Sequence, residues 1–310
     1  MGTSWSVTYG DGSGVLGPQE ISELIVERLE AVNASMSTYR DDSELMLFNQ
    51  SGVGESTLLS GDLQAVLGAA LVVGEASGGA YDVTVAPLVN LWGFGPDGPA
   101  QGVPSVAKIK AVLATVGQQH LQLDDTGTVV KSQPVQVDLS SIAKGFGVDA
   151  VAQILEDAGV TDYLAEVGGE MRLAGLSPRG DAWRVAIESP EPGQRSVALA
   201  FSATDIAVAT SGDYRNFFEV DGTRYSHSID ARTGWPVRHD LVSVTVLHES
   251  AMWADAWATA LTAVGPDGAL SVAQQRGLAV YLIRRQADAL VVEYSAAFAP
   301  YLPADQLSSQ

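Results

Sequence analysis

Residues 135–149 hold the densest group of side chains that could do chemistry. Their sequence, VQVDLSSIAKGFGVD, contains the carboxylate of Asp138, the hydroxyls of Ser140 and Ser141, the amine of Lys144 and two glycines that let a backbone or ligand come close. The pattern predicts a short strand that turns into a helix. A helix start offers unpaired N–H groups and a positive dipole end, so this junction suits a phosphate. On this stretch alone, an ordinary helix start with Lys144 in solvent is the simpler interpretation.

A second candidate is a pair of oxygen ligands four residues apart. Asp255 and Thr259 lie in a segment that is otherwise rich in Ala, Trp, Met and Leu. On a helix this spacing puts both oxygens on one face, where they could take two positions of an octahedral Mg²⁺ shell. The edge of a core helix would give the same pattern. However, a buried Asp without a partner is costly, which favours a metal.

Two more polar segments contain candidate groups. His227 is one of four histidines and lies in the run SHSID at 226–230, close to Asp230. It could act as a general base or orient a phosphate, or it could be an ordinary hydrogen-bonded histidine. Arg215, at the end of the turn-like segment 209–215, could bind a phosphate or a carboxylate, although a solvated turn is the simpler interpretation.

A different chemistry is compatible with three short motifs. The segments 141–144 (SIAK), 211–213 (SGD) and 232–234 (RTG) loosely resemble, in the right order, the S-x-x-K, S-x-N and K-T-G elements of penicillin-binding acyl-serine enzymes. The middle segment ends in Asp, however, and only a short stretch separates it from the third. Pro236 also follows where an uninterrupted strand is needed. We therefore rank this interpretation well below a phosphate site.

Composition excludes several classes of function. The chain has 310 residues and a net charge of −20, from 17 basic and 37 acidic residues, which argues against binding nucleic acid or an anionic membrane surface. Cysteine is absent, so thiol catalysis, disulfides and thiolate metal sites are excluded. Any metal would be held by oxygen or imidazole, which favours a hard ion such as Mg²⁺. No apolar run is long enough to predict a transmembrane segment.

The elements that must position these groups come as single or paired helices followed by runs of strands. Strands are expected at 5–9, 119–124, 128–132, 135–139, 163–167, 171–174, 183–188, 196–201, 205–210, 241–247, 278–285 and 289–294, with a hairpin at 216–229. Helices are expected from 18 to 32, through 47–48, at 60–76, at 106–116, from the end of 135–139 to 159, at 250–265 and at 267–276. This order favours an α+β fold over regular βαβ winding. No composition shift marks a linker, so residues 1–310 are expected to form one integrated unit.

Taken in chain order, the motifs resemble those of the ApbE-type FAD:protein FMN transferases, almost from end to end. They are MGT at 1–3, STY at 37–39, DSEL at 42–45, AYD at 80–82, VDLSSIAKG at 137–145, VGG at 167–169, WRVAI at 183–187, TSGDYRN at 210–216, SHSID at 226–230, TG at 233–234 and ADAWAT at 254–259. No single motif is specific, but this set in this order is. Phe146 stands where tyrosine is common and Ala231 where proline is usual, and neither change affects a polar role.

The resemblance implies an α+β fold with mixed or antiparallel sheets, packed helices and an FAD site in a cleft between subdomains. The FAD contacts that it implies fall on Met1, Tyr39, Ala80, Tyr81, Asp82, Asp138, Lys144 and Ile229. It also implies Mg²⁺ ligands at Asp255, Thr259 and Ser141, the last through its main-chain carbonyl. This agrees with the spacing of the Asp255/Thr259 pair and with the missing cysteines.

Enzymes of this family split the FAD pyrophosphate and pass FMN to a threonine hydroxyl of an acceptor flavoprotein, releasing AMP. We expect Mg²⁺ and Lys144 to offset the charge of the pyrophosphate, and His227 or Asp230 to assist deprotonation of the threonine. Hydrolysis of FAD to FMN and AMP, and flavin binding without catalysis, stay open as alternatives. Because family members usually work outside the bacterial cytoplasmic membrane, we expect the periplasm or the outer face of that membrane, with the signal peptide or lipid anchor trimmed from this chain.

Overall fold

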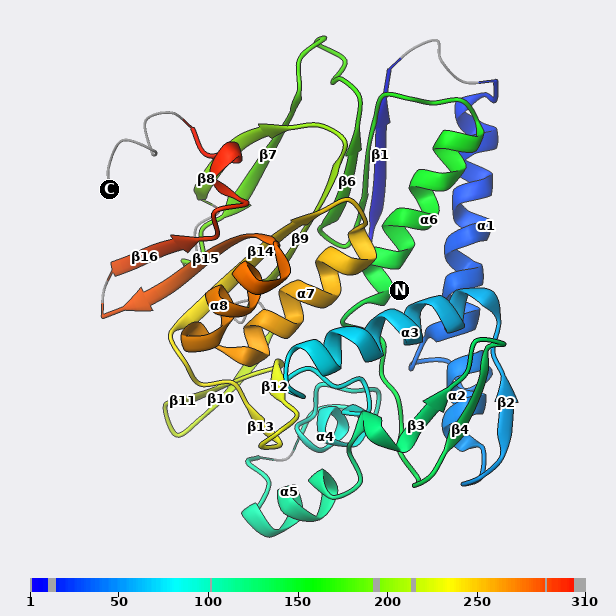
Figure 1. Ribbon diagram of the computed structural model, residues 1–310, viewed down its shortest axis with the longest axis vertical. Helices are drawn as coiled ribbons and strands as arrows, with labels where there is room; N and C mark the ends of the chain where they lie inside the picture. The colour runs from blue at the N-terminus through cyan, green and yellow to red at the C-terminus, as the bar shows by residue number, and fades with distance from the viewer. Residues whose placement is uncertain are drawn as a thin grey trace. The chain divides into compact units, whose positions relative to one another are not determined.

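The computed structural model describes residues 2–10, 15–100, 102–191, 196–212, 216–287 and 289–303, which divide between two compact units (Figure 1). Unit 1 is built from segments 31–143 and 215–238, and unit 2 from segments 2–30, 144–214 and 239–310. The chain passes between the units repeatedly, so both are assembled from segments that lie far apart in the sequence. That residues 1–310 act as one integrated domain stays a prediction.

Within its described residues, unit 2 is organised around a seven-stranded antiparallel sheet. The strands, in spatial order, are β1 (Trp5–Tyr9), β5 (Tyr163–Val167), β6 (Glu170–Ala174), β9 (Ile206–Gly212), β14 (Leu241–His248), β15 (Ala279–Gln286) and β16 (Ala289–Tyr294). An antiparallel sheet with helices gathered beside it is the α+β arrangement, so the predicted fold class is confirmed.

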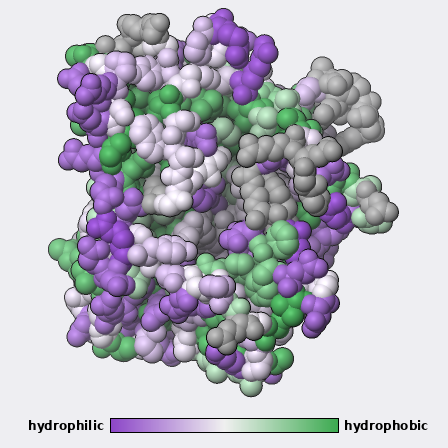
Figure 2. Space-filling view, turned by 180° about the vertical axis from the view of Figure 1, so that it is seen from behind, coloured by the Kyte–Doolittle hydropathy of each residue, from purple (hydrophilic) through white to green (hydrophobic). Residues whose placement is uncertain are grey.

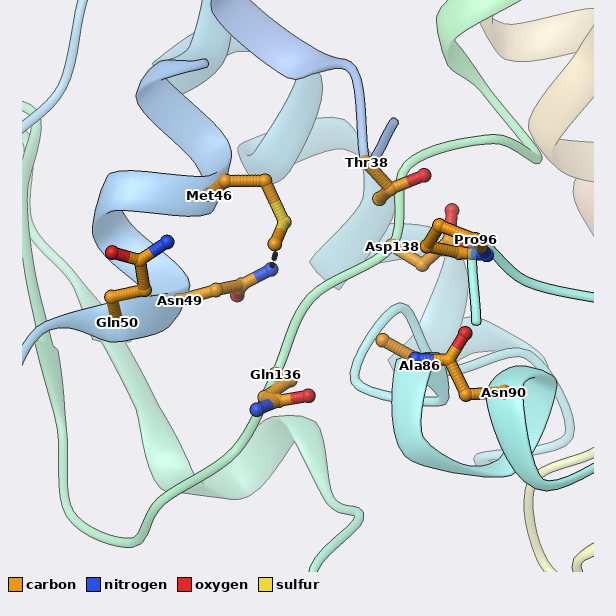
Figure 3. Close-up of a pocket in the computed structure, with 9 residues that line it drawn as sticks. All are labelled: Thr38, Met46, Asn49, Gln50, Ala86, Asn90, Pro96, Gln136 and Asp138. Carbon is orange, nitrogen blue, oxygen red and sulfur yellow. Dashed lines mark hydrogen bonds between the residues drawn. The ribbon is translucent and has the colours of Figure 1, made fainter. Parts of the chain in front are cut away.

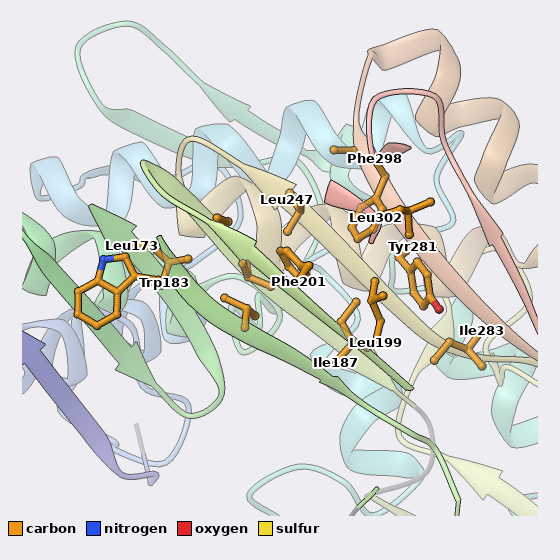
Figure 4. Packing of buried hydrophobic residues seen from close by; sticks show 14 of the residues in the cluster. Leu173, Trp183, Ile187, Leu199, Phe201, Leu247, Tyr281, Ile283, Phe298 and Leu302 are labelled. Atoms are coloured by element: carbon orange, nitrogen blue, oxygen red, sulfur yellow. The ribbon is translucent and has the colours of Figure 1, made fainter. Parts of the chain in front are cut away.

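Helices and a hairpin cover this sheet. In Figure 1, α7 (Ala251–Val264) lies along β9 and β14, while α8 (Pro266–Arg276) packs on α7 and β15. The hairpin of β7 (Trp183–Glu188) and β8 (Val197–Ala203) contributes to a second apolar layer that contains residues of β14 and β15 (Figure 4). Strand β14 is therefore buried along almost its whole length, which explains its nearly continuous apolar sequence.

Aromatic side chains fill part of that second layer. Phe201 of β8 meets Phe298 edge to face, with ring centroids 5.9 Å apart, and the ring centroid of Tyr281 of β15 lies 5.3 Å from that of Phe298. Phe298 is fully buried just before the short 3-10 helix η2 (Ala299–Tyr301). Such pairs contribute roughly 0.5–1.5 kcal/mol beyond their buried area. They fix the segment after β16 against the sheet.

The described part of unit 1 combines short helices with small antiparallel sheets. Its helices are α2 (Glu44–Gln50), α3 (Gly61–Ala76), α4 (Ala86–Leu91), α5 (Val106–Leu113) and the 3-10 turn η1 (Gln118–His120). Its strands are β2 (Ser56–Leu58), β3 (Leu121–Leu123), β4 (Thr128–Lys131), β10 (Phe217–Val220), β11 (Thr223–Ser226), β12 (Ile229–Asp230) and β13 (Trp235–Pro236). The helix α1 (Pro18–Met36) contributes residues to both units, and α6 (Ala143–Asp157) belongs to unit 2 except for its first residue.

Serine caps begin the helices where the sequence predicts them. The Ser60 hydroxyl accepts a hydrogen bond from Leu63 N at the start of α3, and the Ser250 hydroxyl accepts one from Trp253 N at the start of α7. Each bond satisfies one of the N–H groups that a helix start leaves unpaired. Both helices begin where the sequence predicts helices, at 60–76 and 250–265.

The strand predicted at 135–139 is wrong. This segment is extended but joins no sheet, and its only β pairing among the described residues is a single bridge between Gln136 and Val85. The side-chain amide of Asn49 accepts a hydrogen bond of 2.7 Å from Val137 N and donates one of 2.8 Å to Val137 O. Val83 O accepts a further hydrogen bond from Asp138 N. The side chain of Asn49 thus forms the backbone hydrogen bonds that a neighbouring strand would otherwise form.

Across the described ranges, every helix is too short or too polar to span a bilayer. On the face that Figure 2 presents, hydrophilic residues are interspersed with small groups of hydrophobic ones.

Candidate functional site

Lys144, Glu170 and Asp255 form an ionic cluster inside unit 2. The Nζ atom of Lys144 lies 2.6 Å from Oε1 of Glu170 and 3.4 Å from Oδ1 of Asp255. The second carboxylate oxygen of Asp255 accepts a hydrogen bond of 2.9 Å from the N–H of Gly145. Lys144 and Gly145 lie in the first turn of α6, so the helix start that we predicted to suit an anion offers an N–H to a carboxylate of the chain itself.

Burial makes the cluster electrostatically strong. Asp255 and Glu170 are each only 4% exposed. Burial raises the pKa of Asp255 above its usual value, although Lys144 and the Gly145 N–H oppose the change. Burial and the charge of Asp255 raise the pKa of Glu170 to about 7, again against Lys144. For Lys144, burial favours the neutral amine, but the two carboxylates outweigh it and its pKa lies above the usual value.

Two glycines make this geometry possible. A Cβ atom on Gly145 would lie 2.2 Å from Ala251 O and 2.8 Å from the Cβ of Asp255, so only glycine lets α6 approach α7 this closely. Gly168 has φ +65° in the turn between β5 and β6, a conformation that favours glycine, and that turn places Glu170 beside Lys144. The expectation that a glycine here admits another backbone is confirmed.

A separate carboxylate fixes the start of α7. Asp149 of α6 accepts hydrogen bonds from the hydroxyl of Ser250 and from the N–H groups of Ala251 and Met252, at 2.7 to 3.0 Å. Arg172 of β6 lies 3.2 Å from the same carboxylate. This anion at a helix N-terminus sets the position of α7 and therefore of Asp255. Sequence analysis did not assign a role to Asp149, although Asp149 lies on the same helix as Lys144.

The predicted metal pair fits a hard cation in chemical type. Asp255 and Thr259 both lie on α7; the first is buried and the second half-buried. Oε2 of the neighbouring Glu170 is buried without a hydrogen-bond partner in the described chain. The described ranges contain no group of three or more His, Cys, Asp or Glu side chains placed to hold a metal, so hydroxyl or carbonyl oxygens would have to complete the shell.

Ser141 belongs to unit 1, and its hydroxyl donates to the hydroxyl of Tyr81 at 2.9 Å. Its role as a metal ligand through the main-chain carbonyl stays a prediction. The acyl-serine interpretation needs a neutral lysine amine to activate this serine, whereas Lys144 is charged and held by two carboxylates. This arrangement disfavours acyl-serine chemistry.

In unit 1, the predicted FAD residue Asp82 is part of a backbone-binding network. Its carboxylate accepts hydrogen bonds from the N–H and hydroxyl of Thr84 and from the N–H of Gln118, at 2.6 to 2.8 Å. The hydroxyl of Thr84 in turn accepts from Gly117 N. Asp82 therefore ties two loops together, a role that its position after a double glycine did not reveal.

Asp138 lines a pocket of about 120 Å³ in unit 1 (Figure 3). The lining side chains come from α2, α4, the extended segment that ends at Asp138, and the turns that contain Thr38 and Pro96. They are Thr38, Met46, Asn49, Gln50, Ala86, Asn90, Pro96, Gln136 and Asp138. The side-chain oxygen Oδ1 of Asn90 is buried without a hydrogen-bond partner among the described atoms. Sequence analysis missed these amides, because an isolated Asn or Gln carries no charge and no motif.

The other predicted FAD residues differ widely in exposure. Tyr39 is 71% exposed, whereas Ala80, Tyr81 and Ile229 are buried. Ile229 packs into the aromatic cluster around Trp92, whose ring stacks on Tyr225 at 5.5 Å. Met1 and Arg215 lie outside the described residues. The FAD contacts of all these positions, and the cleft between subdomains, stay predictions.

The geometry of unit 1 distinguishes His227 from Asp230. Nδ1 of His227 lies 3.1 Å from Asn216 O. A carbonyl only accepts, so Nδ1 carries the proton of the neutral ring and Nε2 carries the lone pair. The Asp230 carboxylate instead holds Arg232 through Nε, Nη2 and the backbone N–H, each at 2.9 Å. His227 is therefore the better candidate for a base.

Fold and cluster together define an α+β protein in which a half-buried lysine pairs with two buried carboxylates where two helices meet. The ApbE family model matches residues 1–282, and the chain belongs to the ApbE family, as its motifs predict. It is 44% identical to the FAD:protein FMN transferase of Vibrio cholerae over 303 residues, covering 97% of this chain and 90% of that protein. For the protein of the same name from Escherichia coli K12, the identity is 38% over 310 residues, with coverages of 99% and 88%. The solved structure of the flavin transferase ApbE from Vibrio cholerae superposes with a TM-score of 0.91 at 43% identity, covering 97% of this chain and 96% of that one.

Proposed function

We propose that this protein transfers FMN from FAD to a threonine hydroxyl of an acceptor flavoprotein, in a Mg²⁺-dependent reaction that releases AMP. Full-length similarity to proteins named FAD:protein FMN transferase supports the reaction class. The observation that carries the proposal is the ion pair between Lys144, at the start of α6, and the buried Asp255 of α7. It provides a fixed cation and a fixed carboxylate next to each other, as a reaction at a charged pyrophosphate requires.

Lys144 is proposed to bind the pyrophosphate of FAD. Its ammonium stays charged across the physiological range, because the neighbouring carboxylates raise its pKa. The side chain is still 32% exposed, so a ligand can reach it. Little of its position has to change on binding, since Glu170 and Asp255 already hold the amine in place.

Asp255 and Thr259 are proposed to hold Mg²⁺, and the family resemblance adds the main-chain carbonyl of Ser141 as a third ligand. When bound, the ion would supply a Lewis acid that offsets charge on the phosphate oxygens. The protein's own contribution is to fix Asp255: Gly145 N orients one of its carboxylate oxygens and the Asp149 cap sets the helix that carries it. Thr259, one turn further along α7, presents its hydroxyl on the same face.

His227 is proposed to accept the proton of the attacking threonine. The threonine oxygen forms a bond to the phosphorus of the FMN moiety, the bond to the AMP oxygen breaks, and the hydroxyl proton passes to Nε2. Asn216 O orients the ring for this role by fixing the proton of the neutral imidazole on Nδ1. Asp230 is held by Arg232 and would support the local backbone.

Incubation with FAD, Mg²⁺ and an acceptor flavoprotein fragment tests the proposal. We expect a fluorescent acceptor band that survives denaturation and is lost in Asp255→Ala. Release of AMP without any acceptor would instead favour plain FAD hydrolysis. Tight FAD binding with no turnover would favour a non-catalytic flavin-binding protein.

The family resemblance also leads us to propose that the protein acts in the periplasm or at the outer face of the bacterial cytoplasmic membrane. Fractionation of the source bacterium with an antibody against this chain tests the location. Recovery in the cytoplasmic fraction alone would contradict it.

A further inference from the structure

In unit 2, the buried carboxylates of Glu170 and Asp255 lie at different distances from the ammonium of Lys144. Glu170 Oε1 lies 2.6 Å from the Nζ of Lys144, whereas Asp255 Oδ1 lies 3.4 Å away. The shorter contact is a close ion pair, whereas the longer one is a hydrogen bond near the upper limit of length and therefore weak. The ammonium therefore lies closer to Glu170 than to Asp255.

We propose that Glu170 is a positioning residue that holds the ammonium of Lys144 and so keeps Oδ1 of Asp255 available to a divalent cation. This inference rests on the proposed function, because it assumes that Asp255 is a metal ligand. It assigns to Glu170 a role that neither the motifs nor the family resemblance gave it.

The surroundings of Glu170 show no other role for its charge. It is 4% exposed, its Oε2 has no hydrogen-bond partner in the part of the chain that is described, and Lys144 is its only ion-pair partner there. Burying a carboxylate is unfavourable, and a single ion pair rarely offsets the loss of its hydration. Stability alone is therefore a poor explanation for a glutamate at this position.

The charge balance indicates what Glu170 achieves. Without it, Lys144 and Asp255 would form a neutral pair, with the Gly145 N–H on the other carboxylate oxygen. A cation would then have to displace the ammonium from Asp255. With Glu170 present, two carboxylates face one ammonium, so the cluster carries an excess negative charge that a cation can neutralise.

Titration with Mn²⁺ tests this inference, since Mn²⁺ prefers the same oxygen ligands as Mg²⁺ and its free form is counted by electron paramagnetic resonance. In slightly alkaline buffer, we expect Glu170→Gln to raise the Kd for Mn²⁺ about tenfold, the lower end of what outer partners of metal ligands contribute. The matched control is Glu156→Gln, which removes the same charge from a glutamate that pairs with Arg172 in the same unit. It should leave the Kd unchanged.

A double variant separates positioning from simple structural support. The double variant Lys144→Met/Glu170→Gln lacks both the ammonium that competes for Asp255 and the carboxylate of Glu170. Its Kd for Mn²⁺ should therefore return toward that of the unchanged protein. If Glu170 only supported the fold, the double variant would bind no better than Glu170→Gln. An unchanged Kd in Glu170→Gln, or no recovery in the double variant, would overturn the inference.

The same titration distinguishes failure of the proposed metal site from failure of the inference about Glu170. In that case the unchanged protein would not bind Mn²⁺, or Asp255→Ala would bind it equally well, and the inference about Glu170 would fall with it. Binding that depends on Asp255 but not on Glu170 would overturn the inference alone. Circular dichroism and thermal unfolding of each variant exclude loss of fold as the cause of weaker binding.

Discussion

At the residue scale, the site shows how much a single contact determines chemical role. His227 and Asp230 are three positions apart, and either could serve as a base by residue type. The carbonyl of Asn216 fixes the tautomer of His227, whereas Arg232 takes both carboxylate oxygens of Asp230. The contact with Asn216 leaves the lone pair of His227 on Nε2, whereas the contacts with Arg232 engage both carboxylate oxygens of Asp230.

Replacement of His227 should therefore affect chemistry more than binding. We expect His227→Ala to lower kcat for FMN transfer by about 100-fold or more, with little change in KM for FAD, because general base catalysis typically contributes that much. Asp230→Asn keeps the shape of the side chain and should lower kcat only a few-fold. Steady-state kinetics with a saturating acceptor measure both. Unchanged transfer rates in a double alanine variant would show that neither residue is the base.

At the element scale, the side-chain amide of Asn49 holds the extended segment before α6 in place. Val137 is fully buried, and both of its backbone polar groups are bound by Asn49 of α2. Strand-like alternation in this segment reflects alternate burial of its side chains rather than pairing in a sheet. The chain uses this extended segment to bring Asp138 to the pocket and to lead into α6.

Loss of that amide should destabilise unit 1. We expect Asn49→Ala to lower the free energy of unfolding by about 1–3 kcal/mol, because it leaves a buried N–H and a buried C=O without partners. The neighbouring Gln50 is exposed on the same helix, so Gln50→Ala is the matched control and should change little. Denaturant unfolding monitored by fluorescence measures the difference. Equal stability of the two variants would mean that water replaces the amide.

The junction between β14 and α7 should respond to pH. Burial lowers the pKa of His248 below its usual value of 6.5, against the opposing charges of Glu249 and Asp149. Between the lowered pKa and 6.5, the unfolded chain binds more protons than the folded one, so the contribution of His248 is present above 6.5 and is lost as the pH falls. His248→Asn, which can still accept from Ser250 N, should show a smaller loss of stability below pH 6.5. Thermal unfolding across this range provides the comparison, and parallel curves would contradict the assignment.

At the scale of the whole molecule, charge is the constraint on function. A chain with a net charge of −20 repels a pyrophosphate, so any positive charge at the site must be local and protected. Lys144 meets that need because two carboxylates keep it protonated. The same two carboxylates give the cluster the negative excess that suits a divalent cation.

Local signals predicted most elements, because they act over a few residues. The serines at 60 and 250 cap helices by bonds to N–H groups three positions later, and the strands of unit 2 alternate or are fully apolar as their burial requires. Long-range partners account for what was missed. Asn49 binds Val137 from 88 positions away, and Glu170 has a role only because α7 brings Asp255 to Lys144. No short pattern reports such pairings.

Cation binding should stabilise the whole protein by mass action. A ligand that binds only the folded state adds about 2.7 kcal/mol at one hundred times its Kd, so Mg²⁺ should raise Tm in a concentration-dependent manner. Asp255→Asn keeps the size of the side chain but removes its charge, and it should abolish the Mg²⁺-dependent shift even if its own Tm is higher, since it buries no carboxylate. Matched ionic strength of NaCl controls for screening of the acidic surface, and Glu156→Gln controls for the loss of one charge. A full Mg²⁺ shift in Asp255→Asn would show that the ion binds elsewhere on the acidic chain.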